Sequence, residues 1–240
     1  MARIYFVSDV HMRPHFARRA SFFTHFLHSI RGAEAVYMLG DIFDYWVGVG
    51  QLRKALADPV FSALRTLHLG GTKLFFVGGN RDFLVGRELT RVCGVKVLGE
   101  SASVDVGDLK VHLSHGDQFC TKDSDYMIFR AVVRNPLLMA AFKLCVPLFL
   151  RLLIAKLLRR SSKKVVKKKT IEVRDINMVA IKRALRRGND VVICGHIHQP
   201  RHVRIGADRH FYVLGHWDEG PSYLFYENGR FEFVPEWENS

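Results

Sequence analysis

The sequence predicts an α/β sandwich, in which two mixed β-sheets face one another and helices cover their outer sides. Two observations predict this fold. In the first third of the chain, short apolar runs alternate with stretches of helical periodicity, which is typical of βαβ units and a mainly parallel sheet. After Val95 the pattern changes to short strands joined by tight turns.

Three strands and two helices are expected in the first third of the chain. The predicted strands are Ile4 to Ser8, Ala35 to Leu39 and Lys73 to Val77. The predicted helices between them are Phe16 to Ile30 and Leu52 to Leu69. The second helix carries apolar residues at 52, 56, 60, 64 and 67, a helical spacing.

The rest of the chain contains six shorter strands and one long helical interruption. The predicted strands are Ser103 to Val106, Leu109 to Leu113, Val191 to Cys194, Phe211 to Leu214, Tyr223 to Tyr226 and Phe231 to Val234. Gly107-Asp108 and Asn228-Gly229 are predicted to form hairpin turns. Residues 121–187 have helical periodicity throughout. We therefore expect residues 1–120 and 188–240 to form the core, and residues 121–187 to form a helical insertion.

The charge and cysteine content narrow the possible partners and compartment. The chain has 240 residues, a hydrophobic fraction of 48% and a formal net charge of +13. This excess predicts an anionic partner, namely nucleic acid, an anionic membrane or a phosphorylated substrate, although a merely solubilising surface is the alternative. Four widely spaced cysteines indicate reduced thiols. The N-terminus runs straight into a strand without a signal peptide, so a cytoplasmic location is expected.

Five short polar motifs follow predicted strands, where open α/β sheets place their ligands. They are Asp9-x-His11, Gly40-Asp41, Gly79-Asn80-Arg81-Asp82, Ser114-His115-Gly116-Asp117 and Gly195-His196-Ile197-His198. Side chains two apart in extended backbone project to the same side, so each pair, Asp9 with His11 and His196 with His198, can line one cavity. Each motif alone has a structural reading: Asn80 or Asp82 can cap a helix, and His115 can be a core histidine. Together their oxygen and nitrogen atoms indicate a site for Mn²⁺, Fe²⁺ or Zn²⁺.

This series of motifs resembles the calcineurin-like metallophosphoesterase superfamily. The resemblance implies a sandwich fold whose cleft holds two metal ions bridged by one aspartate. One ion would be held by Asp9, His11, Asp41 and His198, and the other by Asp41, Asn80, His115 and His196. Asp41, Asn80, Arg81 and His115 would carry the catalysis, with Arg81 placed to bind a phosphate oxygen.

A narrower resemblance covers most of the chain. Gly79-Asn80-Arg81-Asp82-Phe83-Leu84, the motif from His115 to Asp123, and Leu214-Gly215-x-Trp217 are similar to the UDP-2,3-diacylglucosamine hydrolases of lipid A biosynthesis. The resemblance implies two Mn²⁺ ions, with Fe²⁺ or Zn²⁺ less favoured, and cleavage to UMP and 2,3-diacylglucosamine 1-phosphate (lipid X). It implies substrate contacts from Asn80, Arg81, Asp123, Arg159, Ser162, Lys169 and His196. The sequence departs from this family at Val49-Gly50-Gln51, which replaces an acidic pair, and at Val166.

The predicted insertion has an apolar part, Leu137 to Leu158, and a cationic tract, Arg159 to Lys169. Charged residues and Pro147 interrupt the apolar part, so we expect two short amphipathic helices rather than a membrane span. They would form a lid that holds acyl chains or dips into a membrane interface; ordinary packing on the sandwich is the alternative. Since the cationic tract lacks interleaved aromatic residues, anionic lipid is favoured over nucleic acid. The expected location is the cytoplasmic face of the inner membrane.

Other functions share much of this pattern. A related metallophosphoesterase could act on another nucleotide-linked lipid, or on cyclic nucleotides or nucleic acid phosphodiesters, with the same ligand set. The apolar insertion and Arg81 disfavour nucleic acid and cyclic nucleotide substrates. A non-enzymatic scaffold would not need all seven ligands, and the sequence therefore favours an enzyme.

Overall fold

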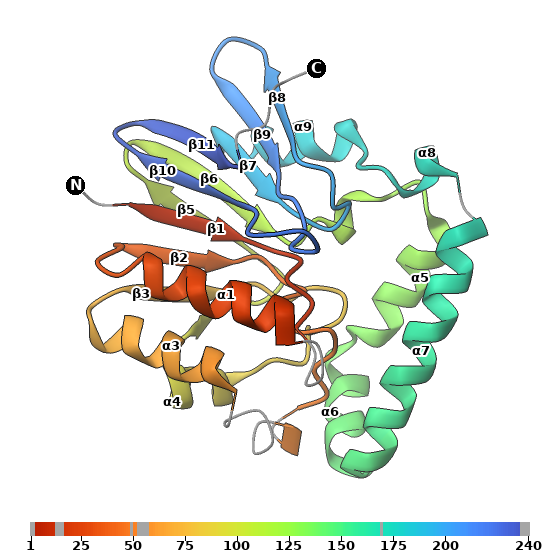
Figure 1. The fold of residues 1–240 in the computed structure, drawn as a ribbon. Helices are drawn as coiled ribbons and strands as arrows, with labels where there is room; N and C mark the ends of the chain where they lie inside the picture. Colours follow the sequence, from red (N-terminus) through yellow and green to blue (C-terminus); the bar gives the residue numbers. More distant parts are fainter. Residues whose placement is uncertain (1–2, 13–16, 49, 52–57, 169, 236–240) are drawn as a thin grey trace.

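The structure is a computed structural model that describes residues 3–12, 17–48, 50–51, 58–168 and 170–235. Two mixed β-sheets lie against one another, and helices cover their outer faces (Figure 1). The predicted fold class is thereby confirmed.

The first sheet has six strands in the order β11-β10-β1-β2-β3-β4. Its members are β1 (Ile4–Val7), β2 (Ala35–Met38), β3 (Lys73–Phe76), β4 (Lys96–Val97), β10 (Tyr223–Glu227) and β11 (Arg230–Val234). β1 to β4 run parallel, while β10 and β11 extend the sheet in antiparallel fashion from β1. Every residue of β1 and β2 is buried, as expected of parallel strands covered on both faces.

The second sheet has five strands in the order β5-β6-β7-β9-β8. Its members are β5 (Ser101–Val106), β6 (Leu109–Ser114), β7 (Val191–Cys194), β8 (Arg201–Ile205) and β9 (Arg209–Val213). β6, β7 and β9 are parallel, and the edge strands β5 and β8 are antiparallel to their neighbours. An apolar cluster that includes Phe6, Leu39, Ile193 and Leu224 joins the two sheets.

The helices outside the first sheet begin where the sequence places its capping residues. α1 (Ala17–Ser29), α3 (Pro59–Leu69) and α4 (Arg87–Cys93) contribute to the apolar cluster on that side. Asp58 caps α3 by accepting from the Val60 amide, and Pro59 occupies its first turn. The start of the predicted helix Leu52 to Leu69, residues 52–57, lies outside the described residues. Among the described residues, four elements were not expected from the sequence, namely β4, β8, α4 and the short 3₁₀ helix η1 (Asp117–Phe119).

Helices α5 to α8 stand beside the sandwich, on the side toward which β1 and β2 point (Figure 1). They are α5 (Ser124–Val133), α6 (Pro136–Cys145), α7 (Leu148–Lys168) and α8 (Ile171–Arg174). The predicted break falls between α6 and α7, at Val146-Pro147. However, α7 is not short, because it continues through the cationic tract to Lys168. Among the described residues, no helix has the length and apolar character to cross a membrane.

α9 (Met178–Arg186) differs from the four helices before it, although it also lies within residues 121–187. Its residues Ile181 and Leu185 are buried in a cluster with β7 and with the short 3₁₀ helix η1 (Asp117–Phe119). α9 therefore covers the outer face of the second sheet. The boundaries of an insertion at 121 and 187 stay a prediction.

An aromatic cluster fixes α1 to the first sheet and to the loop after β9. Phe26 of α1 is 2% exposed. Its ring centroid lies 4.8 Å from that of Tyr223, 5.3 Å from Trp217, 5.8 Å from Tyr5 and 6.1 Å from Phe23. These stacked, edge and tilted contacts between rings stabilise the fold in addition to the burial of the rings themselves. Phe26 therefore ties together three segments that are distant in sequence.

We expect Phe26→Ala to lower the free energy of unfolding by about 3–5 kcal/mol, because it leaves a cavity among four rings. The measurement is urea unfolding followed by fluorescence. Leu69→Ala is the matched control, since Leu69 lies at the end of α3 and is 74% exposed, and it should change stability by no more than about 0.5 kcal/mol. Equal effects of the two substitutions would contradict this account of the core.

Candidate metal and phosphate site

The seven predicted metal ligands all lie at or after the carboxyl ends of strands. Asp9 and His11 follow β1, Asp41 follows β2 and Asn80 follows β3. The remaining three belong to the second sheet, since His115 follows β6 while His196 and His198 follow β7. The structure brings all seven side chains together where these edges of the two sheets meet, through the contacts given below. Their role as ligands stays a prediction.

The first predicted set centres on Asp9, which is fully buried. Asp9 Oδ1 lies 3.2 Å from His198 Nε2 and 3.7 Å from His11 Nε2, and the two imidazole nitrogens are 3.2 Å apart. Asp9, His11 and His198 each offer one atom to a common position, with all three atoms within 4.8 Å of one another. This spacing suits a divalent cation bound by oxygen and nitrogen.

The second predicted set centres on His115, which is also fully buried. Its Nε2 lies 2.8 Å from Asn80 Oδ1, 3.2 Å from His196 Nδ1 and 3.7 Å from Asp41 Oδ1. Asp41 Oδ2 also lies 3.8 Å from His11 Nδ1, so Asp41 touches both sets. Asp9, Asp41 and His115 form a second group of atoms within 4.8 Å. Both carboxylates therefore lie between the two sets.

One buried atom in this cluster, His11 Nδ1, has no hydrogen-bond partner among the described residues. Leaving such an atom unpaired away from water costs free energy unless a ligand satisfies it. The donors are carboxylate and amide oxygens and imidazole nitrogens, with no cysteine among them. The residues present therefore fit divalent metal ions of the Mn²⁺, Fe²⁺ or Zn²⁺ kind.

Burial and neighbouring charges set the protonation of the imidazoles. Burial lowers the pKa of His11 well below its usual value, and the positive charge of Arg81 adds to this. Burial, together with His115, lowers the pKa of His196 to about 4. Burial also acts to lower the pKa of His115, but Asp41 and Asp9 outweigh it and raise that pKa. At neutral pH, His11 and His196 are therefore uncharged, the form that can bind a metal.

Five of the predicted ligands have a left-handed backbone conformation, which is costly for residues other than glycine. Their φ values are 54° at Asp9, 52° at His11, 53° at Asp41, 74° at His196 and 61° at His198. Among the described residues, Asn228 in a hairpin turn is the one other non-glycine residue of this kind. Strain of this kind concentrates at functional sites, because the surrounding fold must hold it in place. The sequence motifs did not indicate this left-handed backbone conformation.

Asp82 ties together the loops that carry Asp41 and Asn80. Its fully buried carboxylate accepts hydrogen bonds from the amides of Gly79 (2.9 Å), Asp41 (3.0 Å) and Phe43 (3.1 Å). Burial and the charge of Asp41 raise the pKa of Asp82 to about 7. The alternative in which Asp82 or Asn80 caps the next helix is wrong, because Gly86 precedes α4.

Glycine at position 79 permits this arrangement. A Cβ at Gly79 would lie 2.3 Å from the amide nitrogen and from Oδ1 of Asp41. Any larger residue would therefore push the β2 and β3 loops apart and displace Asp41. The glycines beside the ligands allow the close backbone approach on which the site depends.

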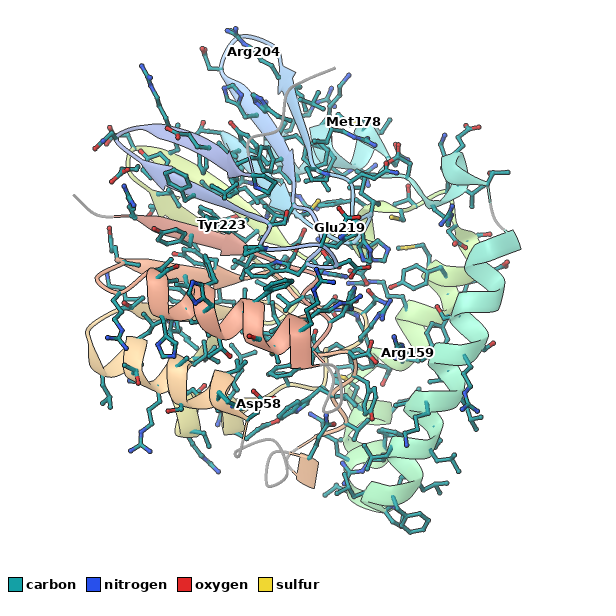
Figure 2. All side chains as sticks on the ribbon, in the orientation of Figure 1. Asp58, Arg159, Met178, Arg204, Glu219 and Tyr223 are labelled. Carbon is teal, nitrogen blue, oxygen red and sulfur yellow. The ribbon has the colours of Figure 1, made fainter. Side chains whose placement is uncertain are left out.

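Arg81 lies between two buried carboxylates. Its Nε is 3.2 Å from Asp41 Oδ2, and its Nη1 donates to Asp44 Oδ1 at 3.1 Å. Asp44 also forms an ion pair with Arg159 of α7. Figure 2 shows Arg159 on the side of α7 that faces the sandwich. The structure thus brings Arg81 and Arg159, both predicted to contact substrate, to one carboxylate beside the metal cluster.

The other predicted substrate residues are placed differently. Asp123 caps α5 by accepting from the Tyr126 amide at 3.1 Å. Ser162 lies exposed on α7, one turn after Arg159. Lys169 lies outside the described residues. Their contacts with substrate stay a prediction.

Asp117 lies beside the site, although no role was predicted for it. It is 1% exposed, and its Oδ2 accepts from Tyr126 Oη at 2.8 Å, Arg130 Nε at 2.9 Å and Arg134 Nη2 at 3.1 Å. Arg134 also donates to the carbonyl oxygen of Gly79 at 3.0 Å. α5 is therefore fixed to two of the ligand-bearing loops. The His-Gly-Asp motif of the sequence includes this aspartate, but the motif does not indicate which residues contact it.

A protein-family model described as calcineurin-like phosphoesterase matches residues 2–200. Together with the sandwich fold, this match shows that the chain belongs to the calcineurin-like phosphoesterase family. A solved archaeal phosphodiesterase shares the fold, with a TM-score of 0.51 at 13% identity over 96% of this chain and 98% of that chain.

Curated relatives place the chain within that family. A UDP-2,3-diacylglucosamine hydrolase of Actinobacillus succinogenes is 34% identical over 226 residues, which cover 93% of this chain and 95% of that protein. One of Aromatoleum aromaticum is 37% identical over 226 residues, which cover 91% of each. The chain belongs with these UDP-2,3-diacylglucosamine hydrolases, which confirms the narrower resemblance.

We expect Asp117→Asn to destabilise the protein at pH 7 by about 3–5 kcal/mol, because it removes the buried anionic partner of Arg134 and leaves it only the half-exposed Glu100. Burial acts to raise the pKa of Asp117, but Arg134 and the nearby histidines outweigh it and hold that pKa far below the usual range. A depressed carboxyl pKa contributes stability above the unfolded pKa of about 3.9, and this contribution is lost as pH falls further. The measurement is urea unfolding of parent and variant at several pH values, and a stability difference that stayed constant down to pH 3 would contradict the assignment.

Proposed function

We propose that this chain hydrolyses the pyrophosphate bond of UDP-2,3-diacylglucosamine, releasing UMP and 2,3-diacylglucosamine 1-phosphate in lipid A biosynthesis. Its relatives carry the name of that activity over more than nine-tenths of the chain. The observation that supports it most directly is the convergence of Arg81 and Arg159 on Asp44 beside the metal cluster. Two guanidinium groups at one place suit a substrate that carries two adjacent phosphates.

The same proposal assigns two Mn²⁺ ions to the cluster, with Fe²⁺ and Zn²⁺ as less favoured occupants. Asp9, His11, Asp41 and His198 would hold one ion, and Asp41, Asn80, His115 and His196 the other. When bound, such a pair neutralises charge on the phosphoryl oxygens and activates water as the nucleophile.

The chain's own residues would position the substrate. Arg81 can grip phosphate oxygens with the N–H groups that Asp41 and Asp44 leave available, since a guanidinium carries five donors. Arg159 would bind the second phosphate from the side of α7. An oxygen from water adds to the phosphorus on the uridine side, the bond to the bridging oxygen breaks, and the lipid phosphate leaves.

Helices α5 to α7 would form the lid over the acyl chains and meet the membrane surface. On α6, Met139 and Phe142 pack against the core cluster, whereas Leu137 and Leu144 are 81% and 84% exposed. Large apolar side chains continue along the three helices, and they are Ile128, Phe129, Val132, Leu138, Phe149, Leu150, Leu153, Leu157 and Leu158. An exposed apolar surface of this extent marks an interaction site.

Cationic residues accompany this apolar surface. Lys143 lies on α6, and Lys156 and Arg160 lie on α7. Anionic lipid headgroups attract such residues at a membrane surface. A peripheral location on the cytoplasmic face of the inner membrane follows from this proposal.

The test of the reaction is hydrolysis of UDP-2,3-diacylglucosamine by the purified chain in ¹⁸O-water. We expect chelation to abolish turnover, Mn²⁺ to restore it best, and the label to appear in UMP. Asp41→Ala should lower the rate far more than about tenfold, because Asp41 contacts both ligand sets. Hydrolysis of cyclic nucleotides or nucleic acid in place of the lipid would overturn the proposal, as would full activity of the metal-free protein.

The lid is tested by charge substitutions on its exposed face. Leu144→Glu with Phe149→Glu should raise the KM for the UDP-lipid and weaken binding to anionic vesicles, because each buried acyl CH₂ is worth about 0.8 kcal/mol. Hydrolysis of bis-p-nitrophenyl phosphate, which has no acyl chain, should be unchanged. Leu69→Glu, equally exposed but on α3, is the matched control. Equal losses on both substrates would mean that this surface is part of the core.

A further inference from the structure

Asp44 occupies an unusual position for a residue outside the predicted ligand set. It lies three residues after Asp41, is 2% exposed, and contacts a guanidinium through each of its carboxylate oxygens. Oδ1 accepts from Arg81 of the Asn80-Arg81 loop, while Oδ2 pairs with Arg159 of α7. One buried carboxylate thus connects the reaction centre with the helix that stands beside it.

We propose that Asp44 is a positioning residue that couples the seating of α7 on the sandwich to the orientation of the Arg81 guanidinium. The choice of substrate rests on the proposed function, but the coupling itself does not. The aspartate acts through the two arginines, and it is not a catalytic residue.

The geometry at Arg81 carries the first half of this inference. Its guanidinium spans from Asp41 Oδ2 at Nε to Asp44 Oδ1 at Nη1, so two buried carboxylates fix the plane of the group. A charge-assisted contact on a buried carboxylate is stronger than an exposed one. Without the negative charge at position 44, Arg81 would keep the Asp41 contact alone and could turn about it. A turned guanidinium would lower the rate of phosphoryl transfer, because the protein contributes mainly position and charge to this reaction.

The second half rests on how α7 meets the core. Arg151, two turns before Arg159 on α7, donates from Nη1 to the carbonyl oxygen of Val47 at 2.7 Å. Arg159 contacts Asp44 three residues earlier in the same loop. Leu148 lies over Gly50, where a Cβ would come within 2.9 Å of the leucine side chain. Asp44, Val47 and Gly50 therefore line the surface on which α7 sits, and Asp44 is the one anionic contact of this surface among the described pairs.

The same loop also has contacts within itself. The side chain of Gln51 accepts from the Val47 amide and donates to the Tyr45 carbonyl. The loop is thereby closed on itself. The buried carboxylate of Asp44 contacts both Arg81 and Arg159, so a movement of α7 relative to the loop reaches Arg81 through this carboxylate.

The experiment compares three substitutions in two assays. Hydrogen exchange of the α7 amides in the substrate-free protein reports the seating of the helix. Asp44→Asn and Arg159→Ala should each accelerate exchange by about threefold or more, because each breaks the contact that holds the helix down. Arg81→Ala should change α7 exchange by less than either of these substitutions, because it leaves the contact between Asp44 and Arg159 in place.

Turnover of bis-p-nitrophenyl phosphate, which needs no lid, reports the orientation of Arg81. Asp44→Asn should lower kcat/KM by about 10- to 100-fold at unchanged metal content. In the Arg81→Ala background the same substitution should cost less than about threefold, because the two changes remove one interaction. Asp44→Asn should thus show both faster α7 exchange and lower turnover. Arg159→Ala tests the contact with α7, and Arg81→Ala tests the contact with the reaction centre.

Glu100→Gln is the matched control. Glu100 also joins two arginines of the helical segment to the core, at 2.6 Å from Arg130 and 3.4 Å from Arg134, but it is half exposed and makes no contact with Arg81. It should leave turnover and α7 exchange unchanged. Should Asp44→Asn fail to fold, Asp44→Glu, which keeps the charge but displaces it by one methylene, carries the same two assays.

Two results would overturn the coupling: normal α7 exchange in Asp44→Asn, or equal losses from Asp44→Asn in the parent and in the Arg81→Ala background. Neither assay uses the UDP-lipid. If that lipid is not hydrolysed while the two assays behave as expected, the proposed substrate is wrong and the coupling stands.

Discussion

The site depends first on the buried carboxylate of Asp82, which is not among the residues predicted to bind metal or substrate. Asp82 accepts three backbone amides from two loops, and by doing so it sets the distance between Asp41 and Asn80. Gly79 makes the approach possible, since any side chain there would collide with Asp41. The energetic balance of the arrangement is delicate, because burial and the charge of Asp41 together raise the pKa of Asp82 to about 7. Cations beside Asp41 would relieve that repulsion.

A second feature is that, apart from the hydrogen bond from Tyr126 to Asp117, the polar connections between α5 to α7 and the ligand-bearing loops described above use arginine. Arg130 and Arg134 contact Asp117, Arg151 contacts the Val47 carbonyl, and Arg159 contacts Asp44. The guanidinium suits these places because it is planar, keeps its charge and offers several donors in fixed directions. Much of the net charge of +13 falls elsewhere. Within the site, basic residues meet buried carboxylates and hold the helices in place.

Much of the fold and the site could be predicted from the sequence, and the remainder has identifiable physical causes. The strand ends that bear Asp41, Asn80 and His196 follow from apolar runs that stop at glycine, the run before Asp9 stops at Ser8, and parallel strands bring such ends to one edge. β8 was missed because Arg-His-Val-Arg-Ile has too little apolar character for a period-two pattern. The roles of Asp44, Asp82 and Asp117 were missed because each is defined by partners distant in sequence. Local patterns contain no information about such partners, or about the left-handed backbone of the ligands.

That left-handed backbone has a consequence for the life of the protein in the cell. Five predicted ligand residues hold a conformation that weakens the folded state, and a cation that bound only the folded state would restore the loss by mass action. The concentration of free metal would then set how often the chain opens, and with it how often a protease finds an unfolded segment. Metal scarcity would thereby reduce the abundance of the protein as well as its turnover number. The supply of one metal would therefore change the total activity in two ways, through the lifetime of the protein and through the reaction itself.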